Sequence, residues 1–214
     1  MHNHIIKICG ISDPNMATKA ARAGANLIGI VFHPASKRYV NDLNLDEAIL
    51  IANAVMKAGA FPVAVFVNHT EVEMRRICEK TNIQIVQLHG EIARTHHHLL
   101  PDHYQRIYVK TLSALGKLKK DEGFQYLQPK RDLILIDHPN PGHGNRINSC
   151  GFHYDLPFQW LLAGGLSSNT VSDAINQFKP DGVDVSSGVE SSRGNKDIFL
   201  IQEFIQSVRG HHDK

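Results

Sequence analysis

Short runs of apolar residues, rich in isoleucine, valine and leucine, recur along this 214-residue chain. They follow one another at intervals of roughly 20 to 35 residues, and most of the intervening segments have the periodicity of an amphipathic helix. Their nearly continuous apolar character predicts parallel strands that are buried on both faces. The runs cover residues 4–9, 27–32, 62–67, 84–88, 105–110, 133–137, 159–163 and 182–185.

Eight strands that alternate with helices predict an α/β fold, a (β/α)8 barrel in a single domain over residues 1–214. Each strand–helix–strand unit is expected to be right-handed. There is no ninth apolar run and no evident edge strand, which favours closure of the sheet. An open, doubly wound sheet is the alternative that this pattern leaves open.

Helical periodicity is clear over residues 14–23, 45–58, 71–80, 169–178 and 196–208. The first of these segments has Ser12 or Asp13 as its N-cap and Pro14 in its first turn, and the second ends at Gly59. The segments after the fifth and sixth strands, 113–123 and 138–157, contain several glycines or prolines. We therefore expect irregular segments that replace or weaken helices 5 and 6 of the barrel.

The composition fits one domain with a sizeable core, since 42% of the residues are hydrophobic. The formal net charge is +2, from 23 basic and 21 acidic residues, and there is no basic face interleaved with aromatic residues. Nucleic acid is therefore not an expected partner. No apolar run approaches the roughly 20 residues of a membrane-spanning helix, and the N-terminus lacks the features of a signal peptide. We expect a soluble, cytoplasmic protein.

The three cysteines, Cys9, Cys78 and Cys150, lack the spacing of a metal site and cannot all pair, which favours a reducing compartment. Cys78 lies on the apolar side of its predicted helix and is interpreted as packing material. The 14 histidines are scattered. Their longest run, residues 96–98, occupies consecutive positions that point in different directions on a helix. We expect this run at the surface rather than at a metal site.

Two apolar runs near the C-terminus break into glycine and serine where each run ends. The first is followed by Gly164 and Gly165, and the second by Ser186, Ser187 and Gly188. Glycine lets backbone N–H groups approach a ligand, and Asn169 could cap the next helix, whose N-terminus also favours an anion. The last two loops of a β/α barrel frequently bind phosphate. We therefore predict a phosphate site here, rather than two ordinary tight turns.

The first strand ends in Lys7-Ile8-Cys9-Gly10, in which Lys7 and Cys9 point to the same face. In a parallel barrel this end of the strand carries the active site. A nearby ammonium lowers the pKa of a thiol and makes the thiolate available as a base or a nucleophile. Cys9 is therefore a candidate catalytic residue, with a small buried cysteine as the alternative interpretation.

Lys7 and Asp184 are charged residues within the otherwise apolar first and eighth strands. Closure of the barrel brings these two strands together, and charges are rarely buried without a partner. We predict that Lys7 and Asp184 pair across the closing seam, below Cys9 and the loop at Ser186. The pair would weaken the electrostatic effect of the Lys7 ammonium on the Cys9 thiol. We nevertheless expect the pKa of the thiol to be lowered.

Three further polar residues lie at strand ends or in the loops that follow them. Asp137 ends the sixth strand after four aliphatic residues and is a candidate general acid, because apolar surroundings raise the pKa of a carboxyl group. Arg38 suits a substrate carboxylate, which a guanidinium binds bidentately, although a solvated surface arginine fits the sequence equally well. His89 faces the same way as Gln87 and either contacts substrate or orients its neighbours.

A set of segments, taken in order, resembles the signature blocks of the phosphoribosylanthranilate isomerase family. They are residues 7–10, 36–40, 65–68, 87–90, 135–137, 163–166 and 182–190, and they span most of the chain. The resemblance implies a (β/α)8 barrel that performs an Amadori rearrangement without cofactor or metal. The implied substrate is N-(5-phosphoribosyl)anthranilate and the product is its 1-deoxyribulose isomer, formed at the third step of tryptophan biosynthesis from chorismate.

The same resemblance implies a role for each candidate residue. Asp137 is the general acid that protonates the furanose ring oxygen, Cys9 is the base that removes the C2 proton, and Arg38 holds the anthranilate carboxylate. The resemblance also implies that the glycine and serine backbones of the last two loops hold the phosphate. The remaining candidate substrate-binding residues are Lys7, His89, Gly144, Gly164, Gly165, Ser186, Ser187 and Gly188. Residues 146–150 depart from the aromatic-acidic triplet with which the family opens its sixth helix.

Two other functions compete with this one. The related isomerase of the histidine pathway acts on a phosphoribosyl imidazole compound and has an aspartate where this chain has Cys9. A non-catalytic barrel that only binds a phosphorylated metabolite would need neither Cys9 nor Asp137. The expected partner is therefore a small phosphorylated substrate, with neither nucleic acid nor membrane, and the chain is expected to be a monomer or a homodimer.

Overall fold

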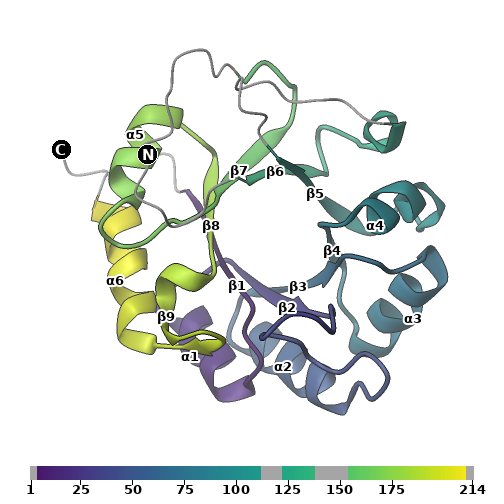
Figure 1. The fold of residues 1–214 in the computed structure, drawn as a ribbon, viewed down its shortest axis with the longest axis horizontal. Coiled ribbons are helices and arrows are strands. Elements are labelled where there is room, and N and C mark those ends of the chain that lie inside the picture. The colour runs from purple at the N-terminus through teal and green to yellow at the C-terminus, as the bar shows by residue number, and fades with distance from the viewer. Residues whose placement is uncertain (1–3, 112–121, 138–153, 211–214) are drawn as a thin grey trace.

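The computed structural model describes residues 4–111, 122–137 and 154–210. Within them, eight parallel strands form a closed barrel with helices around it (Figure 1). The strands are β1 (Ile5–Cys9), β2 (Leu27–Val31), β3 (Phe61–Phe66), β4 (Ile85–Leu88), β5 (Gln105–Thr111), β6 (Leu133–Asp137), β7 (Gln159–Ala163) and β8 (Gly182–Val185). They pair in chain order, and β1 pairs with β8, with Lys7 opposite Asp184. The closed barrel is confirmed, and the open sheet is excluded.

The helices lie on the outer face of the barrel. They are α1 (Pro14–Ala23), α2 (Asp46–Lys57), α3 (Glu71–Thr81), α4 (Glu91–His96), α5 (Val171–Phe178) and α6 (Ile198–Arg209), with short 3₁₀ helices η1 (His97–Leu99), η2 (Glu122–Tyr126) and η3 (Ser187–Val189). Asp13, one of the two N-caps left open by the sequence, caps α1 by accepting a hydrogen bond from the Met16 N–H. The N-cap of α5 is Thr170 rather than Asn169. The prediction that Asn169 caps this helix was therefore wrong.

The predicted irregular regions lie only partly within the described residues. Of the segment 113–123, the described part begins η2, a single 3₁₀ helix between β5 and β6. Of the segment 138–157, the described part contains no helix before β7 begins. These parts agree with the expected weakening of helices 5 and 6.

A short hairpin after β8 was not predicted. Its strands are β9 (Glu190–Ser192) and β10 (Asn195–Lys196), which pair antiparallel apart from the barrel. The predicted start of the last helix at residue 196 was wrong, since α6 begins at Ile198 after the N-cap Asp197. Both strands are polar and lack a buried apolar face, so the apolar pattern gave no signal for them.

The core has two layers. The barrel lumen is filled by Cys9, Leu27, Val31, Val63, Val65, Ile85, Ile107, Val109, Leu133, Leu135, Leu161 and Ala163. The larger layer lies between the strands and the surrounding helices and includes Cys78, which is buried and has a pKa raised by desolvation. Its role as packing material is confirmed. Among the helices of the described residues, none has the length and apolar character needed to cross a membrane.

The histidine run at residues 96–98 differs from the expected surface position at its centre. His97 is fully buried, its Nε2 lies 2.8 Å from the Gly123 carbonyl oxygen, and its ring packs edge-on against Tyr108. His98 is exposed and stacks on Tyr126. The run therefore contributes to packing around η1 and η2, and the prediction was wrong for His97.

Candidate active site

Strand β1 brings an ammonium and a thiol to the lumen. Lys7 and Cys9 are both buried, and they converge on Gly29 of β2, whose lack of a side chain makes room for them. A Cβ placed on Gly29 would lie 2.8 Å from Cys9 Sγ and 3.2 Å from Lys7 Nζ. The shared face inferred from strand alternation is therefore the face that lines the lumen.

Lys7 pairs with Asp184 across the seam that closes the barrel. The distance from Lys7 Nζ to Asp184 Oδ1 is 2.8 Å, and the two side chains are 0% and 10% exposed. Burial alone would lower the pKa of Lys7, but the Asp184 carboxylate and the Cys9 thiolate outweigh it and raise the pKa. The predicted pair is confirmed, and the ammonium stays charged in the lumen.

The pKa of Cys9 shifts in the opposite direction to the one expected. Desolvation is the largest influence and raises the pKa of the thiol, and the Asp184 carboxylate raises it further. Lys7 and Lys196 oppose this rise but do not overcome it. The expectation of a lowered pKa was wrong, because the cost of burying a thiolate exceeds the attraction of an ammonium already paired with a carboxylate.

Asp137 ends β6 on the lumen side. It is two residues beyond Leu135, which belongs to the lumen layer, and it lies in register with Thr111 of β5 and Ala163 of β7. Side chains alternate along a strand, so the Asp137 carboxylate projects toward the lumen at its C-terminal end. Cys9 ends β1 at that same end, with β7 and β8 between the two strands. A ligand over the mouth of the barrel can therefore contact both groups.

The loops after β7 and β8 lie against each other beside this mouth. Gly164 and Gly165 have φ angles of 100° and 64°, in the left-handed region that favours glycine. The backbone of Gly188 passes so close to the carbonyl of Leu166 that a Cβ could not fit between them. Ser186 Oγ donates a hydrogen bond of 3.0 Å to the Cys9 carbonyl oxygen, which ties the second loop to the end of β1. Together these loops form a cradle of small residues adjacent to the thiol.

Arg38 crosses the mouth from the loop after β2. Its aliphatic carbons pack against Gly10, which has a φ of 81° and leaves no space for a Cβ. Its Nε and Nη2 donate bidentately to Glu190, at 2.5 and 2.8 Å, and the side chain is 20% exposed. Arg38 thus lies next to the end of β1, and Nη1 has no protein acceptor among the described residues.

His89 and Gln87 mark the opposite wall of the mouth. Gln87 is buried in β4, and its Oε1 has no hydrogen-bond partner among the described residues. His89 follows β4, with its N–H donating to the Phe66 carbonyl and its carbonyl accepting from Arg94 Nη1. Desolvation lowers the pKa of His89, against the opposing effect of Asp184. The ring is therefore neutral near pH 7 and close enough to the lumen to sense its charges.

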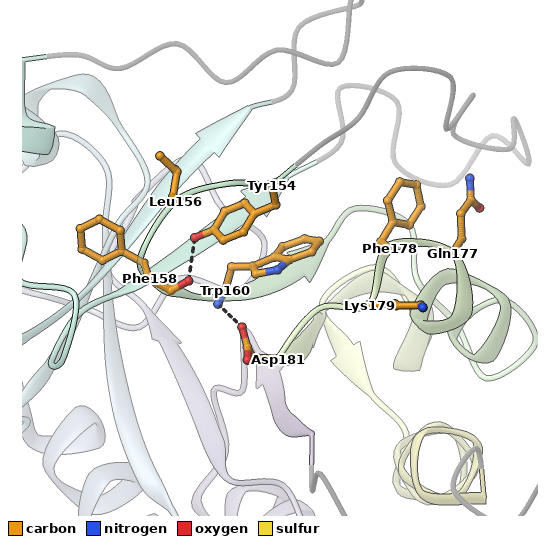
Figure 2. Close-up of a pocket in the computed structure, with 8 residues that line it drawn as sticks. All are labelled: Tyr154, Leu156, Phe158, Trp160, Gln177, Phe178, Lys179 and Asp181. Atoms are coloured by element: carbon orange, nitrogen blue, oxygen red, sulfur yellow. Dashed lines mark hydrogen bonds between the residues drawn. The ribbon is translucent and has the colours of Figure 1, made fainter.

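A cavity lies at each end of the barrel. One of about 520 Å³ lies at the mouth and is lined by Arg38, Ser187, Glu190, Ser192 and Arg193. Another of about 440 Å³ lies where β7 and β8 begin, between Tyr154, Trp160, Lys179 and Asp181 (Figure 2). In Figure 2, Tyr154 stacks on Trp160, and the Asp181 carboxylate accepts a hydrogen bond from the backbone N–H of Trp160. The candidate residues within the described part of the chain lie at the mouth, the end at which β/α barrels carry their active sites.

Residues 6–207 match the family model of N-(5'-phosphoribosyl)anthranilate (PRA) isomerase. The chain belongs to this family. The isomerase of Chlamydia felis is 35% identical over 205 residues, which are 95% of this chain and 96% of the relative. A solved structure of TrpF from Jonesia denitrificans is 30% identical, with a TM-score of 0.81 over 98% of both chains.

A further solved isomerase of the family is in complex with reduced 1-(o-carboxyphenylamino)-1-deoxyribulose 5-phosphate. It is 29% identical to this chain, with a TM-score of 0.71, and the alignment covers 97% of this chain and all of that one. That ligand carries a carboxylate at one end and a phosphate at the other. Of the candidate substrate-binding residues, Gly144 lies outside the described part of the chain.

Two charged residues beside the candidate site were not predicted from the sequence. Glu190 and Lys196 face each other across the β9–β10 hairpin, at 2.7 Å, with side chains 4% and 3% exposed. Glu190 ended a signature segment and Lys196 was assigned to a helix, so neither was considered for the site. The signal available was the Arg193-Gly194 pair between them, a turn that would have suggested a hairpin.

Proposed function

We propose that this chain converts N-(5-phosphoribosyl)anthranilate to 1-(2-carboxyphenylamino)-1-deoxyribulose 5-phosphate. The observation that carries the proposal is that Cys9 and Asp137 end β1 and β6 at the same end of one barrel, beside the two glycine-containing loops. Family membership supports the same reaction. It is an aldose–ketose isomerisation, the third step from chorismate in tryptophan biosynthesis.

In the proposed mechanism, Asp137 donates a proton to the furanose ring oxygen as the C1–O bond breaks, which leaves an iminium at C1. Cys9, as thiolate, removes the proton from C2, and the electron pair forms the enolamine. Protonation at C1 and loss of the enol proton at C2 give the ketone. Two protons enter and two leave, and C1 is reduced while C2 is oxidised, so the reaction balances without an external redox partner.

We propose that the two anionic ends of the substrate bind on opposite sides of this chemistry. The phosphate would accept hydrogen bonds from backbone N–H groups of the loops at Gly164–Gly165 and Ser186–Gly188, which come together where Gly188 passes the Leu166 carbonyl. The carboxylate would bind the unused Nη1 side of Arg38. Lys7 and His89, near Cys9 at the mouth, would contact the sugar between them.

Replacement of Arg38 by alanine is expected to raise KM about tenfold or more with a smaller effect on kcat, because a charge-assisted contact to the substrate is lost. Arg38→Lys should recover only part of this loss, since an ammonium cannot reproduce a bidentate fork. Steady-state kinetics with purified variants measure both effects. Unchanged KM in Arg38→Ala would remove Arg38 from substrate binding.

The proposed function is tested by a fluorescence assay that follows the disappearance of phosphoribosylanthranilate made in situ. The purified chain should consume it in the presence of a metal chelator. The phosphoribosyl imidazole compound of the histidine pathway is the comparison substrate and should turn over far more slowly. Phosphate-ester binding without turnover of either compound would instead favour a non-catalytic barrel.

The cytoplasm is the compartment that we propose for this activity. Both described cysteines, Cys9 and Cys78, are free thiols, and the proposed base must remain reduced to act. The oligomeric state, monomer or homodimer, stays a prediction from the sequence.

A further inference from the structure

A buried carboxylate joins two loops at the mouth of the barrel. The Glu190 side chain accepts from Arg38 Nε and Nη2, and also from Lys196 Nζ at 2.7 Å. The Gly194 N–H, in the turn of the hairpin, donates to it at 3.2 Å. A bidentate pair restricts rotation of the guanidinium, so this geometry holds Arg38 in one orientation.

The same network continues to the loop after β8. Lys196 Nζ donates to the Ser186 carbonyl oxygen at 2.9 Å and lies 3.2 Å from Ser186 Oγ. Ser186 Oγ in turn donates to the Cys9 carbonyl oxygen at 3.0 Å. An unbroken series of hydrogen bonds therefore runs from Arg38 through Glu190 and Lys196 to Ser186 and Cys9.

We propose that Glu190 and Lys196 are positioning residues that fix the separation between the carboxylate site and the phosphate site. The inference rests on the proposed function, because that substrate carries one anion at each end. A rigid connection between the two sites favours ligands whose anions match its length, and it places the sugar between them over Cys9. Neither residue needs to touch the substrate for this role.

The charges of the network make the inference testable. Burial alone would raise the pKa of Glu190, but hydrogen bonds from Arg38 and Lys196 lower it to about 2, so the carboxylate is ionised in any ordinary assay. Glu190→Gln removes one negative charge between two cations, which by attraction alone would tighten the binding of every anion. If Glu190 positions Arg38, the same substitution should instead weaken the binding of a ligand with two anions, because Arg38 is no longer held in place.

The experiment compares Glu190→Gln with Glu190→Asp, which keeps the charge but withdraws the carboxylate by one methylene. Glu203→Gln, an exposed position on α6, is the matched control for charge. Calorimetry measures the Kd of two probes, reduced 1-(o-carboxyphenylamino)-1-deoxyribulose 5-phosphate and inorganic phosphate. We expect both Glu190 variants to bind the two-anion probe about tenfold more weakly, with inorganic phosphate changed by less than about twofold.

Three results would overturn the inference. One is a Glu190→Asp variant that binds the two-anion probe as tightly as wild type, and another is a Glu190→Gln variant that binds it more tightly. Either result would show that Glu190 acts only through its charge. Equal weakening of both probes would show that it only supports the fold. Glu190→Asp keeps a negative charge beside Arg38 and Lys196. It therefore carries the test if Glu190→Gln does not fold. A wild-type chain that binds the two-anion probe but does not turn over phosphoribosylanthranilate would refute the proposed function and leave the binding comparison intact.

Discussion

Cys9→Ser is expected to lower kcat by about 100- to 10,000-fold with little change in KM, because a general base acts at the barrier rather than in ground-state binding. Serine has nearly the same size, but its hydroxyl does not ionise near neutral pH. Asp137→Asn should lower kcat in the same range, since an amide cannot protonate the ring oxygen. Steady-state kinetics of the fluorescence assay measure both.

Cys78→Ala is the matched control for the thiol, because Cys78 is buried on the outer side of the barrel wall and outside the site. Its kcat per folded molecule should equal that of wild type. Near-wild-type kcat in Cys9→Ser or Asp137→Asn would remove that residue from its proposed role. Loss of activity in all three variants alike would point to unfolding instead.

The raised pKa of Cys9 predicts a pH dependence of kcat that separates wild type from Cys9→Ser. A base acts when deprotonated, and a raised pKa leaves the thiol mostly protonated at neutral pH. The wild-type kcat should therefore rise with pH and should still be rising above about 8.5, the pKa of a free thiol, as the thiolate fraction grows. In Cys9→Ser the residual rate should not follow this curve. A wild-type kcat that falls over this range would contradict a thiolate base.

Asp184→Ala is expected to destabilise the fold by about 3–5 kcal/mol, the usual cost of leaving one member of a buried ion pair without its partner. The Lys7 ammonium would remain in the lumen with 0% exposure. Equilibrium denaturation measures the free energy of unfolding. The pair joins β1 to β8, so its loss acts on the seam that closes the barrel.

Asp173→Ala on α5 is the matched control, an exposed aspartate that should cost less than about 1 kcal/mol. Lys7→Met combined with Asp184→Leu should recover a large part of the lost stability, because no charge then stays buried. A change in unfolding free energy as small in Asp184→Ala as in the control would mean that the pair contributes no net stability.

The barrel could be predicted because its strands are buried on both faces. Residues 133–137, 159–163 and 182–185 were placed with their observed bounds, since continuous apolar runs mark such strands. The Lys7–Asp184 pair followed from closure together with the rarity of unpaired buried charges. These features depend on strand pairing and on the apolar pattern, which the sequence carries directly.

Other features depend on surroundings that the sequence does not list. The sign of the Cys9 pKa shift is a balance between desolvation and charge, and the depth of burial decides it. His97 is buried because Tyr108 and Gly123 approach from other elements. The Arg38–Glu190 contact joins residues 152 positions apart through a polar hairpin that has no apolar periodicity. Local patterns cannot reveal such contacts.

We expect substrate to lie across the mouth of the barrel with its carboxylate at Arg38, its phosphate at the loops after β7 and β8, and C2 beside Cys9. A crystal structure of this chain with reduced 1-(o-carboxyphenylamino)-1-deoxyribulose 5-phosphate tests it most directly. We predict phosphate oxygens within hydrogen-bonding distance of the Gly164–Gly165 and Ser186–Gly188 backbone, and Cys9 Sγ within about 3.5 Å of C2. A ligand bound in the reverse orientation, or in the cavity at Tyr154 and Trp160, would contradict the account.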